Sequence, residues 1–133
     1  MTFIPGDSVE RERLEWGEAG WVAVPANVPD SARMTAIDVR LDPGEGHDFH
    51  KHPHQDEIIY LWSGTLEQWI GDEKRIMSAG DSCFVPMDTV HASFVPKDAP
   101  PARIFVVLSP SFGEDGYEAV EVADQMPWST LRS

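Results

Sequence analysis

The chain contains little cysteine and few basic residues, and each scarcity excludes certain structures or partners. Its 133 residues include one cysteine, Cys83, so no internal disulfide can form. Because Cys83 lies in an apolar run, we expect a small buried residue rather than a nucleophile. Only ten lysines and arginines accompany 23 aspartates and glutamates, and the formal net charge of -13 repels nucleic acid and anionic membranes. We therefore expect neither among its partners.

Long apolar runs are also missing. No stretch approaches the roughly 20 apolar residues that cross a bilayer. Residues 1–7 lack the basic and then apolar regions of a signal peptide, so a cytoplasmic location is the default expectation. What the chain does contain, 41% hydrophobic and 10% aromatic residues, is enough to build one compact core.

Short runs rich in β-branched and aromatic residues, separated by glycine, proline and aspartate turns, are typical of an all-β protein. Several such strands in succession indicate a sandwich or barrel. The charged segment 10–15 suits a solvated helix or an edge strand equally well. The expected strands cover residues 20–24, 34–41, 57–62, 66–70, 82–85, 91–95 and 103–108.

Histidines are concentrated: four of the five lie within eight residues, and His91 follows at a distance. His50 and His52 are two residues apart, so on an extended strand both imidazoles project from one face. A carboxylate at Glu57 on the next strand, together with His91, would complete four ligands around one ion. These donors suit divalent iron, manganese, nickel, copper or zinc, and a six-coordinate ion would keep two positions open. A histidine cluster without a metal is the alternative.

The same residues resemble the two cupin motifs. The first motif, G-x5-H-x-H-x4-E-x6-G, is matched at every defined position. The matching residues are Gly44, His50, His52, Glu57 and Gly64.

The second motif, G-x5-P-x-G-x2-H-x3-N, is matched by Gly80, Pro86 and His91. Asp88 replaces its last glycine and Val95 replaces its asparagine. Aspartate tolerates the left-handed backbone conformation better than most residues, so we expect the turn to keep its shape.

The resemblance implies a single-domain double-stranded β-helix, the jelly-roll cupin barrel, over residues 32–110. Residues 1–31 are then an N-terminal extension that packs on the barrel or on a partner subunit, and residues 111–133 are an acidic tail. One divalent transition metal is the expected cofactor, and a small organic molecule is the expected substrate.

Strand alternation after Glu57 places Ile58, Tyr60 and Trp62 on the outer face of the barrel. Such an apolar stripe marks an interface, and cupins are frequently dimers, so we expect a homodimer. The alternative is that the first thirty residues, which contain Trp16 and Trp21, fold back over the stripe.

Alternation also sorts the side chains around the site. We expect Asp48, Ser93 and Val95 to point inward, His47 to point outward into solvent, and His54 to lie on the surface or behind the ligands. The polar residues considered for substrate contact are Tyr60, Gln68, Ser93 and Arg40, although Tyr60 is outward by the same alternation.

Three functions remain open. The first is a metal-dependent oxygenase or dioxygenase, in which substrate and dioxygen use the two open positions. The second is a non-redox isomerase, lyase or cyclase acting on a sugar or organic acid, in which the ion polarises a carbonyl. The third is a non-catalytic binding module. The fold alone does not separate them, because one scaffold hosts many chemistries.

Overall fold

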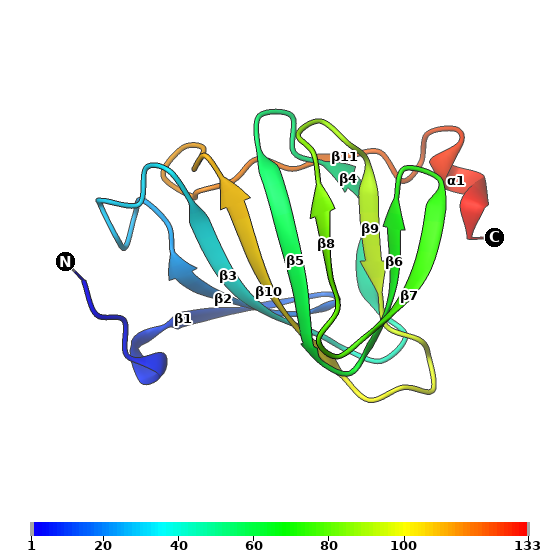
Figure 1. The fold of residues 1–133 in the computed structure, drawn as a ribbon, viewed down its shortest axis with the longest axis horizontal. Coiled ribbons are helices and arrows are strands. Elements are labelled where there is room, and N and C mark those ends of the chain that lie inside the picture. The colour runs from blue at the N-terminus through cyan, green and yellow to red at the C-terminus, as the bar shows by residue number, and fades with distance from the viewer. Residues whose placement is uncertain (1, 133) are drawn as a thin grey trace.

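The computed structural model describes residues 2–132, and these form two antiparallel β-sheets (Figure 1). The first sheet contains, in spatial order, β1 (Glu10–Leu14), β2 (Gly17–Ala23), β3 (Thr35–Leu41), β10 (Ala102–Ser109), β5 (Asp56–Ser63) and β8 (Ser82–Val85). The second contains β11 (Val120–Glu121), β4 (Gly46–Lys51), β9 (His91–Phe94), β6 (Thr65–Ile70) and β7 (Glu73–Ser78). A 3-10 turn (Gly6–Ser8) and the short helix α1 (Trp128–Leu131) are the remaining elements.

Two facing sheets linked by crossovers form a jelly-roll barrel, and the expected all-β class is confirmed. The seven expected strands fall on β2, β3, β5, β6, β8, β9 and β10. The charged segment 10–15 forms the edge strand β1 and no helix. Strand β7 was not expected, because it is a largely exposed edge strand in which only Met77 is buried.

Residues at both ends of the chain take part in the sheets. The hairpin of β1 and β2 continues the first sheet beside β3, with Gly17 opposite Leu41. At the other end, β11 pairs with β4 and places Glu121 opposite His50. Both ends of the chain therefore lie against the walls of the barrel.

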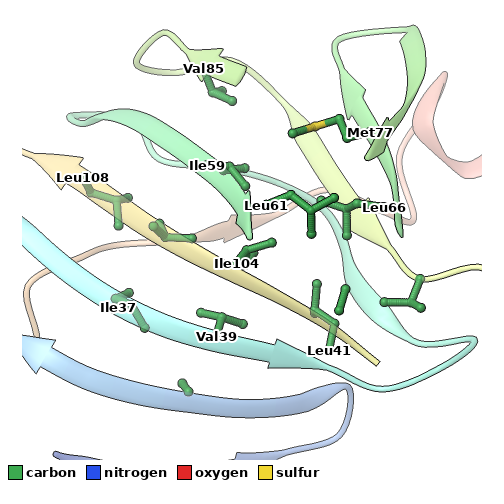
Figure 2. Close-up of a cluster of buried hydrophobic side chains, with 14 residues drawn as sticks. Ile37, Val39, Leu41, Ile59, Leu61, Leu66, Met77, Val85, Ile104 and Leu108 are labelled. Atoms are coloured by element: carbon green, nitrogen blue, oxygen red, sulfur yellow. The ribbon is translucent and has the colours of Figure 1, made fainter. Parts of the chain in front are cut away.

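The main core fills space between the two sheets (Figure 2). Alternate residues of β10 and β5 are buried there, which follows from the two-residue period of a strand. In Figure 2, Ile59 and Leu61 of β5 approach Leu66 of β6 and Ile104 of β10. This packing fixes β5, the strand that carries Glu57.

A second, smaller core lies on the outer face of the five-stranded sheet. Phe49, Trp69 and Phe94 form it with Ala92 and Val122. Trp128 of α1 covers it, stacked on Phe49 at a centroid distance of 5.7 Å. The helix therefore packs on the outside of the barrel. No helix among the residues described has the length and apolar character needed to span a bilayer.

The outward stripe of β5 stays exposed, with Ile58 at 47%, Tyr60 at 43% and Trp62 at 44% of full exposure. The alternative in which the first thirty residues cover this stripe is wrong, because β1 and β2 extend the sheet edgewise beside β3. The homodimer stays a prediction.

Candidate metal centre

Three buried histidines meet at one end of the barrel interior. His50 of β4 is the register partner of His91 of β9, and His52 follows directly after β4. Their ring centroids lie 4.2 Å (His50 to His91), 5.0 Å (His50 to His52) and 5.1 Å (His52 to His91) apart. One ring nitrogen of each lies within 4.8 Å of the others. This arrangement could hold a metal ion.

Each ring is oriented by a backbone carbonyl. Nδ1 of His50 lies 2.7 Å from the Asp48 oxygen, Nδ1 of His52 lies 2.8 Å from the Glu118 oxygen, and Nδ1 of His91 lies 2.9 Å from the Thr89 oxygen. A carbonyl oxygen can only accept, so each Nδ1 carries the proton and donates it. In the neutral rings, each Nε2 is left with a free lone pair. This is the tautomer that binds metals, held by outer contacts typical of metal-bound histidines.

Glu57, at the start of β5, adds a buried carboxylate to the three rings. Its Oε1 lies 2.7 Å from Nε2 of His91 and 3.5 Å from Nε2 of His52. Burial alone would raise its pKa, but the contacts with His52 and His91 outweigh burial and lower the pKa to about 2. Glu57 is therefore ionised at neutral pH.

The pKa values of the two paired histidines shift in opposite directions. Burial, reinforced by the neighbouring His47, His91 and His52, lowers the pKa of His50 well below its usual value. Burial also acts to lower the pKa of His91, but the contact with Glu57 and its charge raise it overall. His50 thus stays neutral over the physiological range, as a metal ligand must.

The four side chains fit a divalent transition ion. Imidazole and carboxylate donors are the set that iron, manganese, nickel, copper and zinc share. Within residues 2–132, Glu57 Oε1 and His91 Nε2 are buried without a partner in hydrogen-bond geometry. Unpartnered buried polar atoms are costly in an apolar interior, and a bound cation would satisfy both.

The turn before β9 keeps its shape despite Asp88. This residue adopts a left-handed conformation with φ of 60°, as expected for aspartate in place of glycine. Its amide donates to the His52 carbonyl at 2.9 Å, and its carboxylate pairs with Lys51 at 3.0 Å. The turn that leads to His91 is thereby joined to the strand end that carries His52.

The donors open into a cavity between the sheets with a volume of about 70 Å³ for the centres of water-sized molecules. Aliphatic side chains of β3, β5 and β10 form a large part of its wall, among them Ile37, Val39 and Val106. Ser93, which points inward as expected, is one of its few polar residues, and its hydroxyl donates to Oε1 of buried Gln68 at 2.6 Å.

The expected positions of His47 and Asp48 were both wrong. His47 lines the cavity, stacks face to face on His50 with centroids 3.5 Å apart, and contacts Glu121 at 2.9 Å. Asp48 is exposed, and its carboxylate accepts a hydrogen bond from the Phe49 amide. The cause is a register shift in β4 between His47 and His50 against β9. Such a bulge reverses the alternation on one side of itself.

The other candidates for substrate contact lie apart from the donors. His54 is exposed, stacked on Phe112 and 3.5 Å from Glu118, as expected for a surface position. Tyr60 and Arg40 are exposed on the first sheet. Val95 is buried in the main core, as its inward parity predicts.

Sequence reasoning missed the residues that complete the cavity from the two ends of the chain. Trp16 and Trp21 line it from the N-terminal hairpin, and Tyr117 lines it from the segment before β11. Buried Gln55 was missed too: its side chain donates to the carbonyls of residues 110 and 116 and accepts from the Glu118 amide. The histidine spacing carries no information about these long-range contacts.

A jelly roll with these motif residues around one cavity defines a class of protein. A family model described as "Cupin domain" matches residues 37–108, which is more than half of the chain, and the chain belongs to this family.

Individual relatives are distant. The chain is 24% identical over 122 residues to "Polyketide synthase CurC" of Streptomyces cyaneus, covering 89% of this chain and 79% of that protein. It is 26% identical over 89 residues to "Mannose-1-phosphate guanylyltransferase 2" of Escherichia coli O157:H7, covering 67% of this chain but only 18% of that protein. The solved structure of KdgF from Halomonas sp. superposes with a TM-score of 0.72 at 26% identity, covering 84% of this chain and 96% of that one.

Proposed function

We propose that the protein is a metal-dependent enzyme that binds one divalent transition ion through His50, His52, Glu57 and His91 and acts on a small organic molecule. The observation that supports it is the convergence of three buried imidazoles and one ionised carboxylate on the wall of a mainly apolar cavity. When bound, such an ion supplies Lewis acidity toward oxygen atoms of a substrate and, for iron, nickel or copper, redox chemistry with dioxygen.

Metal analysis tests the ligand assignment. We expect the purified protein to retain about one equivalent of cobalt(II) or zinc(II) after dialysis, and His50→Ala and Glu57→Gln to weaken retention by about 100-fold, because each removes a donor. The matched control is His54→Ala, which removes an exposed imidazole of the same histidine cluster and should leave retention unchanged. Full retention in both ligand variants would refute the assignment.

As the first of two candidate reactions, we propose oxygenation of the substrate. The cavity is mainly apolar and sheltered by both sheets, which suits a small organic molecule held out of bulk water. A non-redox isomerase, lyase or cyclase is the second candidate. It is favoured by the likeness, over most of both chains, to a protein that is named as a polyketide synthase and not as an oxygenase.

Turnover with and without oxygen separates these reactions. The metal-loaded protein is offered a panel of diketones, phenols, thiols and hydroxy acids under air and under argon. Oxygen consumption that stops under argon supports the oxygenase. Equal conversion in both atmospheres supports the non-redox enzyme. A tightly bound metal with no conversion in either atmosphere supports a binding module and contradicts the enzyme proposal.

A further inference from the structure

Aromatic rings from outside the matched cupin region line the metal cavity. Trp16 and Trp21 precede residue 37, and Tyr117 follows residue 108. Trp21 stacks on Tyr117 with centroids 5.6 Å apart, and Trp16 stacks on His47 with centroids 5.5 Å apart. All three rings are only half-buried, so part of each remains free of protein contact. The cavity wall thus offers aromatic surface close to the metal donors.

Lysine and arginine are absent from the same wall among the residues described. The surroundings are acidic instead: burial, followed by the charges of Glu12, Glu121 and Asp115, raises the pKa of Tyr117. Apart from a bound metal ion, nothing on the wall would balance a phosphate or a second carboxylate. The site therefore disfavours multiply charged anions.

The size of the cavity limits the ligand further. About 70 Å³ of the cavity is open to the centres of water-sized molecules, which is room for several waters. That space suits a single small ring. Ser93 supplies one polar contact: its proton is used by Gln68, so its oxygen is free to accept from a ligand N–H or O–H.

We infer that the cavity takes a neutral, flat, unsaturated ring compound that meets the metal through two neighbouring oxygen atoms. This inference rests on the proposed function, because it requires the ion at the four donors. The aromatic rings recognise the flat faces of the ring, the acidic surroundings exclude anionic analogues, and the aliphatic wall excludes water. The N-terminal hairpin and the segment before β11, both outside the family match, thus set the substrate class.

Three oxygen chelators test this inference in the cobalt(II)-loaded protein. Maltol is a flat ring with two adjacent oxygens, acetohydroxamate is an acyclic chelator, and oxalate is a flat dianion. Each association constant is divided by the association constant of the same chelator for aqueous cobalt(II), which removes the intrinsic metal preference. We expect the corrected affinity for maltol to exceed the corrected affinities for acetohydroxamate and oxalate by at least tenfold.

Single substitutions test whether the aromatic residues of the cavity cause the preference for maltol. Trp21→Leu and Tyr117→Leu should weaken maltol binding by about three- to tenfold, which is the scale of one lost aromatic contact. Both variants should keep the affinity for acetohydroxamate within twofold of the wild-type value. Trp62→Leu is the matched control, since it removes an exposed indole on the outer face of β5. Cobalt(II) absorbance is recorded for every variant, so a loss of metal is not mistaken for a loss of chelator.

The outcomes distinguish this inference from the proposed function. Cobalt(II) retention with equal corrected affinities, or with tighter oxalate, overturns the flat-ring inference and leaves the metal site standing. A maltol preference that survives both cavity variants also overturns it. A wild-type protein that retains no cobalt(II) refutes the metal site and the inference together.

Discussion

Gly46, at the start of β4, lies against β9 so closely that a side chain has no room. A Cβ atom there would stand 2.1 Å from the Ser93 oxygen and 2.7 Å from the Phe94 Cα. We expect Gly46→Ala to lower the free energy of unfolding by about 1–3 kcal/mol, the usual cost of overpacking. Urea denaturation measures it. Gly6→Ala, which meets nothing within 4 Å, serves as the control and should be neutral; equal stability of the two variants would contradict the close approach.

The thiol of Cys83 should be unreactive at neutral pH. Burial, with a smaller contribution from the charge of Glu57, raises its pKa to about 12. Only about one thiol in ten thousand is then ionised at pH 8. We expect alkylation by iodoacetamide to be slow at pH 8 in the native protein, to rise with pH toward 12, and to become fast in urea. Rapid labelling of native protein at pH 8 would show an accessible thiolate.

The sequence predicts residue positions well where backbone periodicity holds. His50, His52 and Glu57 follow from strand spacing and from the family motif, and the structure brings them together with His91. His47 could not be placed this way, because one bulge between it and His50 reverses the alternation. A bulge depends on pairing with β9, and pairing is a property of the folded sheet.

At the scale of elements, buried strands were easier to predict than edge strands. The strands β5 and β10 alternate between buried and exposed positions along their length, and the sequence shows this as alternating apolar residues. The strands β7 and β11 are largely exposed, so their residues carry little hydrophobic pattern. Their places in the sheet follow from the strands beside them.

Gln55 connects two elements and should matter for metal affinity without touching the metal. It holds the segment 110–118 through three hydrogen bonds, and this segment supplies the Glu118 carbonyl that orients His52. We expect Gln55→Ala to weaken cobalt(II) binding by about tenfold or more, as loss of a contact that orients a ligand does. Gln125→Ala, at an exposed glutamine, is the control. Unchanged affinity in Gln55→Ala would show that His52 needs no such support.

At the scale of the whole molecule, the edge strand β1 opposes sheet-to-sheet association. Leu14 faces the cavity, so by alternation Glu10 and Glu12 share the inner face, while Arg11 and Arg13 share the outer face. If two copies joined β1 to β1 in antiparallel fashion, opposite residues would share a face, and glutamate would meet glutamate while arginine would meet arginine. Like charges directly opposite each other destabilise a pair of strands. We therefore expect a dimer to use another surface.

The exposed stripe of β5 remains the surface for the predicted homodimer. Ile58, Tyr60 and Trp62 lie beside exposed Phe84 of β8 and form an apolar patch on the outer face of the six-stranded sheet. Such patches mark interfaces because water contact with them is unfavourable. We expect light scattering to give twice the chain mass of 14.8 kDa, and Ile58→Glu to give the monomer, since a buried unpaired charge is costly. Ile76→Glu places the same charge at an exposed isoleucine of β7 and should keep the dimer. A wild-type mass of one chain at micromolar concentration would remove the dimer, while a dimer that survives Ile58→Glu would move the interface elsewhere.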